Sequence, residues 1–137
     1  MHTLLTTRLS NKTDQNFILA TWLKGLRYGC EYFEALEATE YFDQYNRILK
    51  EVLARPSTIT EIACLVDEPD TIIGYAVKTP PNTLHWIFVK SAWRGQGVAH
   101  KLLGEGIIAA THYSAPGLAI MRKKQIIFRP WLLGVPK

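Results

Sequence analysis

Apolar residues recur every three or four positions over two stretches in the first half of the chain, which is the spacing of one helix face. The first stretch spans residues 14–28. The second follows Thr39, which can cap a helix, and stops at Arg55-Pro56, because proline excludes the preceding residue from helical geometry. The pattern predicts two amphipathic helices, with a short strand over 3–9 before them and an irregular acidic segment over 30–38 between them.

After the second helix the pattern changes to that of strands. β-Branched and aromatic runs cover residues 58–66, 71–78 and 83–89, and short sequences rich in Asp, Pro and Asn separate them. Three consecutive strands joined by short turns predict an antiparallel meander. A glycine-containing turn over 93–97 follows the third strand directly.

The rest of the chain predicts shorter elements, which are a helix over 98–110, a short strand over 111–114, a helix over 116–124, and a strand over 126–133 interrupted by Pro130. The residues of the first of these helices that are expected to face inward are Val98, Leu102, Leu103, Ile107 and Ile108. The order β-α-α-β-β-β-α-β-α-β predicts an α/β (α+β) fold. We expect one mixed, largely antiparallel, twisted sheet with helices on both faces.

The composition is that of one globular domain covering residues 1–137. Of the 137 residues, 47% are hydrophobic, which excludes disordered and disulfide-scaffold proteins. The net charge of +4 is unevenly spread, because residues 1–89 carry 8 basic and 11 acidic side chains whereas residues 90–137 carry 8 basic and one acidic. A polyanionic ligand would favour the C-terminal third, and a chance asymmetry on a solvated surface is the alternative.

The two cysteines, Cys30 and Cys64, lack the spacing of a metal site, and Cys64 falls in an apolar run that is typical of a core. No bound metal is expected, and the composition favours a reduced, cytoplasmic protein. The start of the chain has no secretory signal pattern. The longest uncharged stretch, residues 106–121, contains His, Ser and Pro and does not predict a membrane span.

The stretch from Leu84 to Ala99 carries the most specific functional signal. A strand leads into a tight turn that opens a helix, so several backbone N–H groups lack partners and form a site suited to phosphates. Gly95 and Gly97 allow a ligand to approach the backbone, and Arg94 adds a positive charge with a planar donor fork. An ordinary strand-to-helix turn is the structural alternative.

This stretch resembles the acetyl-CoA motif of the GNAT superfamily of N-acetyltransferases, whose pattern Arg/Gln-x-x-Gly-x-Gly/Ala is filled by Arg94, Gly97 and Ala99. Val89 stands five residues before the arginine, as in the family, while Ser91 replaces the family's usual proline. The order of elements over residues 3–115 also resembles the superfamily. The first helix is similar to small acetyltransferase-like proteins of phage and prophage genomes.

The resemblance implies that coenzyme A, as acetyl-CoA, is the cosubstrate. Backbone N–H groups from Gln96 to Ala99 would bind its pyrophosphate, the strand around Ile87 would pair with its pantetheine arm, and the N–H of Val89 would stabilise the thioester oxyanion. The implied binding residues are Ile87, Phe88, Val89, Arg94, Gly95, Gln96, Gly97, Val98 and Ala99. The implied activity is transfer of an acetyl group to a primary amine of a small molecule or protein, by direct attack on the thioester.

Two residues are the candidates for proton transfer. The amine must lose a proton before it attacks. His85, placed by strand alternation on the same face as Ile87 and Val89, could accept that proton directly or through water. Tyr113, like its neighbour His112, follows the third helix where the family has its next strand, and could reach the sulfur. The alternatives are a histidine satisfied within the fold and core packing of Tyr113 and His112.

The acceptor side departs from the family pattern. The family's late helix carries a tyrosine near the sulfur, which residues 115–124 lack, and two strands follow it where this chain offers one broken strand. The alternative function is therefore a weakly active or inactive acetyl-CoA-binding or protein-interaction module, for example a phage-encoded modulator of a host protein. A homodimer could also complete the site, with Phe128 and Trp131 packing on the second subunit or on the sheet.

Charged residues outside the motif have competing interpretations. An acidic rim for a cationic amine, or a solvated loop, could be formed by Glu31, Glu34, Glu37 and Glu40. The basic residues near the C-terminus are Arg122, Lys123, Lys124, Arg129 and Lys137. They could bind nucleic acid, but no nucleic-acid motif accompanies them and that partner is not expected.

Overall fold

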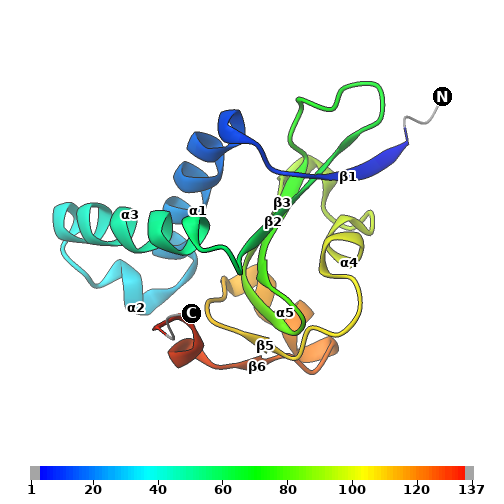
Figure 1. Ribbon diagram of the computed structural model, residues 1–137. Helices are drawn as coiled ribbons and strands as arrows, with labels where there is room; N and C mark the ends of the chain where they lie inside the picture. Colours follow the sequence, from blue (N-terminus) through cyan, green and yellow to red (C-terminus); the bar gives the residue numbers. More distant parts are fainter. Residues whose placement is uncertain (1–3, 135–137) are drawn as a thin grey trace.

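A six-stranded mixed sheet forms the centre of the molecule, with its strands in sequence order (Figure 1). The computed structural model describes residues 4–134, so Thr3 of the first predicted strand and Lys137 lie outside it. Strands β1 to β4 pair antiparallel, and β5 and β6 continue the sheet in parallel with β4. The bounds are Leu5–Leu9 for β1, Ile59–Leu65 for β2, Gly74–Thr79 for β3, Thr83–Val89 for β4, Ala109–Ala110 for β5 and Ile127–Phe128 for β6.

Helices cover both faces of this sheet (Figure 1). On one face lie α1 (Gln15–Gly29), α2 (Glu31–Glu34) and α3 (Ala38–Ala54), and on the other lie α4 (Val98–Leu103) and α5 (Ala115–Lys123). The predicted fold class is confirmed, and the main elements follow the predicted order. The helix α2 is an addition, in a segment predicted to be irregular. No helix in the described part of the chain is long and apolar enough to cross a lipid bilayer.

The first turn of α3 is capped by a different residue from the one predicted. The prediction that Thr39 caps this helix is wrong, because Glu37 is the N-cap residue. Its carboxylate accepts hydrogen bonds from the backbone N–H of Glu40 at 2.8 Å and of Thr39 at 3.1 Å. These two donors hold the pKa of the Glu37 carboxyl below its ordinary value. One member of the acidic run therefore has a structural role.

Helix α4 is shorter than predicted, because it ends at Leu103. Gly104 follows with φ +63° and ψ −152°, a conformation that is open almost only to glycine. Ile107 and Ile108 continue the apolar spacing but lie outside the helix. Ile107 still packs against the buried residues under α4, whereas Ile108 is 48% exposed, so the prediction that Ile108 faces inward is wrong. The chain instead forms β5, which comes before the strand predicted over residues 111–114.

The last predicted strand, over residues 126–133, is reduced to the two residues of β6. The N–H of Arg129 still donates to the carbonyl of Ala110 at 2.8 Å. Pro130 has no N–H with which to continue this ladder. A 3-10 turn over Pro130–Gly134 therefore takes the place of the rest of the strand.

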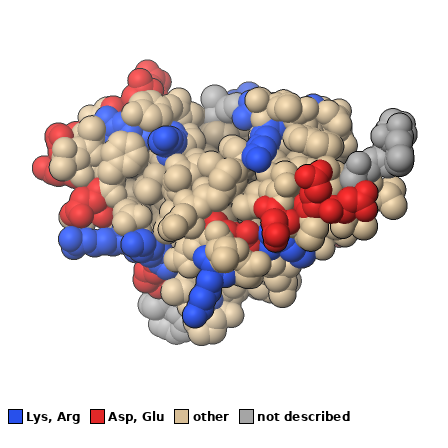
Figure 2. Space-filling model, turned by 90° about the horizontal axis from the view of Figure 1, so that it is seen from above, with Lys and Arg blue, Asp and Glu red and all other residues tan. Residues whose placement is uncertain are grey.

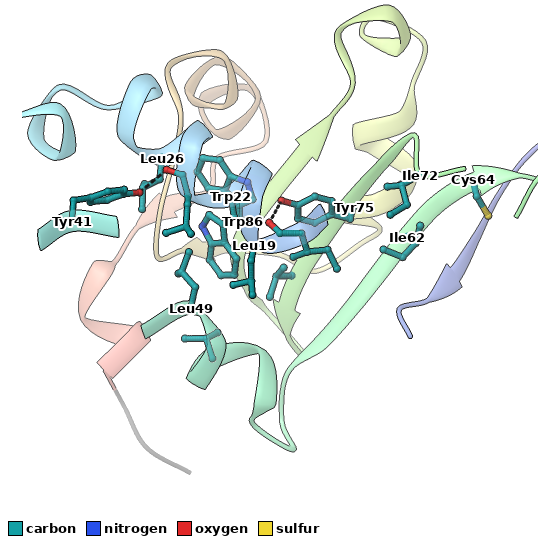
Figure 3. Close-up of a cluster of buried hydrophobic side chains, with 14 residues drawn as sticks. Leu19, Trp22, Leu26, Tyr41, Leu49, Ile62, Cys64, Ile72, Tyr75 and Trp86 are labelled. Atoms are coloured by element: carbon teal, nitrogen blue, oxygen red, sulfur yellow. Dashed lines mark hydrogen bonds between the residues drawn. The ribbon is translucent and has the colours of Figure 1, made fainter. Parts of the chain in front are cut away.

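Two hydrophobic clusters hold the helices to the sheet. The larger lies between the sheet and helices α1 and α3 (Figure 3) and contains Trp22 and Trp86, whose rings stack with centroids 6.2 Å apart. The hydroxyl of Tyr75 is satisfied within it by donating to the carbonyl of Ile18 at 3.0 Å. Cys64 is a free thiol fully buried in this cluster, as its apolar run predicts. The second cluster joins α4 and α5 to the opposite face.

An irregularity in the pairing of β3 with β4 changes the direction of the side chains of β4. Consecutive residues of β3 pair with Leu84 and Trp86, so His85 is an extra residue in β4. Leu84 packs in the cluster under α4 and Trp86 in the cluster under α1, although strict alternation would put both on one face. The prediction that His85 shares a face with Ile87 and Val89 is wrong for this reason.

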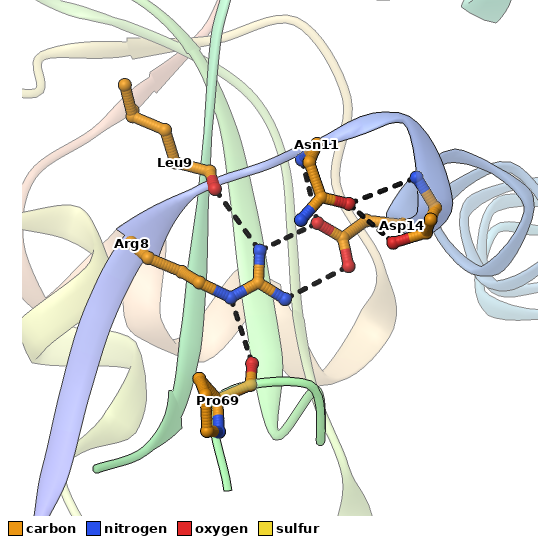
Figure 4. A network of polar contacts seen from close by, with 6 residues as sticks. Arg8, Leu9, Asn11, Asp14 and Pro69 are labelled. Carbon is orange, nitrogen blue, oxygen red and sulfur yellow. Dashed lines mark hydrogen bonds and ion pairs between the residues drawn. The ribbon is translucent and has the colours of Figure 1, made fainter.

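An ion pair anchors β1 to the start of α1 (Figure 4). The guanidinium of Arg8 donates to both carboxylate oxygens of Asp14, at 2.7 and 3.0 Å, and to the carbonyl of Pro69 at 2.9 Å. Asp14 is 4% exposed and also accepts a hydrogen bond from the N–H of Asn11 at 2.8 Å. The hydrogen bonds from Arg8, helped by this N–H, hold the pKa of Asp14 below its ordinary value of 3.8.

We expect Asp14→Asn to lower the free energy of unfolding at neutral pH by about 2 kcal/mol, because it removes a charge-assisted pair from a part-buried site. The ion pair stabilises the native state fully above the unfolded-state pKa of Asp14, and this contribution is lost as pH falls through the lowered pKa of the folded state. The free energies of unfolding of wild type and variant, measured with urea, should therefore differ less near pH 3 than near pH 7. An equal difference at both pH values would contradict this interpretation.

Candidate functional site

A groove of about 770 Å³ runs along β4 on the side where β5 separates from it. Its walls are the C-terminal end of α1 and the start of α5, and it reaches the turn between β4 and α4. The groove brings together all of the predicted binding residues except Gln96, whose side-chain Nε2 donates to the carbonyl of Ala92 at 3.2 Å. Further lining residues, which the sequence did not single out, are Gly25, Tyr28, Gly29, Trp86, Trp93, His100, Ser114, Gly117 and Ile120.

The groove exists because β4 and β5 pair only through two residue pairs at their start. In the antiparallel ladder between β4 and β3, alternate residues direct their backbone groups toward the partner strand. Lys90 does so, since its N–H donates to the carbonyl of Ile73 at 2.9 Å. The same alternation directs the backbone groups of Ile87 and Val89 away from β3 and into the groove. A ligand with amide groups could therefore bind there as an added strand.

The turn before α4 leaves its backbone open to a ligand. Gly95 has φ +78° and Gly97 has φ +81°, and a Cβ built on either residue would meet no atom within 4 Å. Helix α4 has only six residues, so the unpaired N–H groups of its first turn, rather than a long helix dipole, supply the attraction for an anion. Arg94 is exposed beside them, and its Nε donates to the carbonyl of Val89 at 3.2 Å.

Glycines shape the walls of the groove at two positions. Gly25 of α1 faces the indole of Trp86, and a Cβ at this position would lie 2.8 Å from Cζ2 of that ring. Gly117 of α5 packs against Ser114, whose hydroxyl accepts a hydrogen bond from the Gly117 N–H at 3.2 Å and caps the helix. A glycine inside a helix normally lowers its stability, so Gly25 was a sequence signal for close packing.

We expect Gly25→Ala to destabilise the protein by about 1–2 kcal/mol, although alanine ordinarily stabilises a helix interior. The new methyl group meets the Trp86 ring, which cannot retreat because it stacks on Trp22. Thermal denaturation of the single variant and of Gly25→Ala combined with Trp86→Phe forms a double-mutant cycle. The smaller phenylalanine ring should relieve the clash. Additive changes in stability in the cycle would contradict a contact between the new methyl group and the Trp86 ring.

A small cavity of about 20 Å³ adjoins the groove, with which it shares lining residues that include Trp86, Ile87 and Ser114. This volume is enough for one methyl group or one water molecule. His112 and Tyr113 also line the cavity, and Tyr113 packs edge-to-face on Phe128 with ring centroids 5.0 Å apart. That either residue reaches the sulfur of the cosubstrate stays a prediction.

His85 lies inside the fold and away from the groove. It is 1% exposed, and both ring nitrogens have partners: Nε2 lies 2.7 Å from Oγ1 of Thr79 and Nδ1 lies 2.9 Å from Oγ1 of Thr111. Burial, followed by the positive charge of Arg55, lowers its pKa from 6.5 to about 4. This geometry does not favour the predicted role of a base in direct contact with a substrate.

The acidic run follows one wall of the groove in the sequence. Glu31, Glu34, Glu37 and Glu40 are all exposed, and the first two follow Tyr28 and Gly29, which line the groove. Figure 2 shows acidic side chains at the end of the molecule formed by α2 and α3 and again over the turn between β2 and β3, with basic side chains between them. The acidic surplus of the N-terminal part is therefore divided between two places.

The sequence matches the profile of the acetyltransferase (GNAT) family over residues 24–120, which is more than half of the chain. The chain belongs to the GNAT acetyltransferase family. This match confirms the resemblance predicted from the turn, and with it acetyl transfer as the general activity and acetyl-CoA as the cosubstrate of the family. The matched residues include both walls of the groove and the turn at its end.

Solved structures share this fold at low sequence identity. A protein assigned as an acetyl transferase from Pyrococcus furiosus superposes with a TM-score of 0.67 at 12% identity, over 92% of this chain and 95% of its own. A predicted acetyltransferase from Clostridium acetobutylicum, solved with acetyl-CoA, gives 0.60 at 17% identity over 88% of each chain. An aminoglycoside N-acetyltransferase in complex with CoA gives 0.51 at 18% identity, over 100% of this chain and 91% of its own. A search of curated protein sequences gives no significant match.

Proposed function

We propose that this chain is an N-acetyltransferase that transfers the acetyl group of acetyl-CoA to a primary amine. The observation that carries the proposal is the groove itself, because the open edge of β4 leads without interruption to a turn with two glycines at positive φ. An extended arm with amide groups fits the first part and a diphosphate fits the second. Solved members of the fold hold CoA or acetyl-CoA, which supports the same ligand here.

Different residues along the groove would bind different parts of the cosubstrate. The backbone groups of Ile87 and Val89 would hold the pantetheine arm, and the Val89 N–H would stabilise negative charge on the thioester oxygen. The N–H groups from Gln96 to Ala99, with Arg94 beside them, would hold the pyrophosphate. When bound, the cosubstrate supplies an acetyl thioester. Tyr113 and His112, both in the wall of the adjoining cavity, remain the predicted groups that could reach the sulfur.

An amine is the acceptor that the surface near α2 favours. The exposed carboxylates of Glu31 and Glu34 follow the groove-lining residues Tyr28 and Gly29 in sequence. A cationic amine is attracted to such a rim over distances of about one Debye length, near 8 Å at physiological ionic strength. We therefore place the acceptor entrance between the end of α1 and the start of α5.

Calorimetry and a thiol-release assay test this function. Acetyl-CoA should bind the native chain, and Arg94→Glu should weaken binding by about tenfold, since one charge-assisted contact is replaced by a repulsive one. Lys101→Glu on α4 makes the same charge change outside the groove and should bind normally. Thiol release should then require an added amine, tested with spermidine, tobramycin and a lysine-containing peptide.

Two results would overturn the proposal in different ways. Absence of acetyl-CoA binding by the native chain would exclude it altogether. Binding without amine-dependent release of thiol across the panel would favour the alternative of a cofactor-binding or protein-interaction module. That outcome would agree with the short C-terminal part, where β6 has two residues and the chain between Ala115 and Lys124 lacks a tyrosine.

A further inference from the structure

A continuous line of four hydrogen-bonded polar side chains runs from the wall of the small cavity to the end of β3. Nδ1 of His112 lies 3.0 Å from Oγ1 of Thr111, which lies 2.9 Å from Nδ1 of His85. Nε2 of His85 in turn lies 2.7 Å from Oγ1 of Thr79. The four residues come from the end of β3, the irregular position of β4 and the segment after β5, so the register shift of β4 is what brings them together.

The two ends of this line lie in different environments. His112, at 6% exposure, forms part of the wall of the cavity that adjoins the groove. Thr111 and His85, at 2% and 1% exposure, are enclosed, whereas Thr79 is partly exposed at the end of β3. The line therefore connects the wall of the small cavity that adjoins the groove to the partly exposed end of β3 through hydrogen bonds alone.

The hydrogen-bonding capacity of these groups permits two arrangements of protons. A neutral imidazole has one N–H and one acceptor nitrogen, and a threonine hydroxyl donates one proton and accepts others. In one arrangement His112 donates from Nδ1 to Thr111, Thr111 donates to Nδ1 of His85, and His85 donates from Nε2 to Thr79. Nε2 of His112 then carries no proton. In the other arrangement every donor is reversed, and His112 carries its proton on Nε2.

We propose that the line from His112 through Thr111 and His85 to Thr79 is a proton relay for acetyl transfer, with His112 as its catalytic end. The inference rests on the proposed function. As the N–C bond to the acetyl carbon forms, Nε2 of His112 takes the proton that the amine loses. Each group passes its own proton one place along, and Thr79 releases one to water. As the C–S bond breaks, a proton returns by the same route, and His112 delivers it to the leaving sulfur.

Burial of the two histidines disfavours their charged forms, so the line would transfer a proton rather than keep it. Burial, followed by the charge of the other histidine, lowers the pKa of His112 from 6.5 to about 4, and burial also lowers that of His85. Both imidazoles are therefore neutral near pH 7. The aromatic rings of Trp22 and Phe33 pack against the His112 ring, with centroids 5.9 and 6.4 Å from its centroid. Thr111 and His85 are positioning residues, since they act through His112.

Two substitutions of Thr111 test the relay, because valine and serine are both close to threonine in shape but only serine keeps the hydroxyl group. Thr111→Val replaces the hydroxyl by a methyl group, and should lower kcat by at least about tenfold while leaving KM for acetyl-CoA unchanged. Thr111→Ser keeps the hydroxyl and should retain most of kcat. The solvent deuterium isotope effect on kcat should also change in the valine variant alone. An equal kcat in the valine variant and wild type, for the amine of the panel that reacts fastest, would overturn the relay.

A second measurement needs neither cosubstrate nor turnover. Nitrogen-15 NMR of the free protein reports the tautomer of each histidine, and Thr79→Val changes only the partly exposed far end of the line. A connected relay should shift the tautomer ratio of His112, which Thr79 does not touch. An unchanged ratio would mean that the hydrogen bonds are separate and would overturn the proposal. If the native chain fails to transfer acetyl groups, the NMR measurement still shows whether the hydrogen bonds of the line are coupled to one another.

Discussion

Replacing Gly97 with glutamate is expected to weaken acetyl-CoA binding by about 100-fold or more. Gly97 is the residue before α4 and has φ +81°, a conformation that costs other L-residues about 1–2 kcal/mol. Its surroundings are open, so the new side chain meets no clash and projects where the phosphates of the cosubstrate would bind. A like-charge contact there costs several kcal/mol, and every 1.4 kcal/mol corresponds to about tenfold in affinity. Isothermal titration calorimetry measures the effect.

Gly104→Glu is the matched control for this variant. Gly104 lies at the opposite end of the same helix, also has a positive φ of +63° and also has open space around a Cβ. It does not line the groove. The control therefore adds the same charge without touching the proposed phosphate site, and its ψ of −152° makes the backbone strain at least as large as at Gly97. Its affinity for acetyl-CoA should stay close to that of wild type, and an equal loss in both variants would show that the effect comes from the helix and not from the site.

The central part of the site could be predicted because its determinants are close together in sequence. The strand that ends at Val89, the exposed Arg94 and the two glycines of the turn lie within one short stretch, and the structure brings them to one groove. Their conformations follow from local chemistry, since glycine alone adopts positive φ without strain. Family membership extends this prediction to the cosubstrate.

Other features depend on contacts between distant segments, and the local sequence pattern does not show which segments meet. His85 was placed on the wrong face because the register shift arises in the pairing of β4 with β3, while the sequence of β4 alternates normally. Gly25 and Gly117 come from two helices that face each other only in the folded chain. Helix α4 was predicted too long because Ile107 and Ile108 continue its apolar period, and the conformation of Gly104 overrides that period.

Mild acid is expected to remove several kcal/mol of stability, and this is the largest effect that we expect on folding. His85 and His112 have pKa values lowered by burial from 6.5 to about 4. Between these values the unfolded chain binds protons that the folded chain does not. The stability contributed by the neutral imidazoles is therefore complete above about pH 6.5 and is lost as pH falls toward 4. Each imidazole accounts for about 3 kcal/mol, an appreciable part of the 5–15 kcal/mol typical of a domain.

The variant His112→Phe distinguishes protonation of the buried histidines from other causes of acid sensitivity. Phenylalanine keeps an aromatic ring beside Trp22, and Thr111 retains its bond to His85, so the variant should remain folded. Urea unfolding measured at several pH values between about 4 and 7 gives the free energy of unfolding that is lost on acidification. This loss should be smaller by about 3 kcal/mol in the variant than in wild type. His100→Gln, at an exposed histidine of α4, is the control and should follow the wild type. Because the carboxyl of Asp14 titrates below this window, a loss confined to pH values under 4 would assign the acid sensitivity to the Arg8–Asp14 pair and not to the buried histidines.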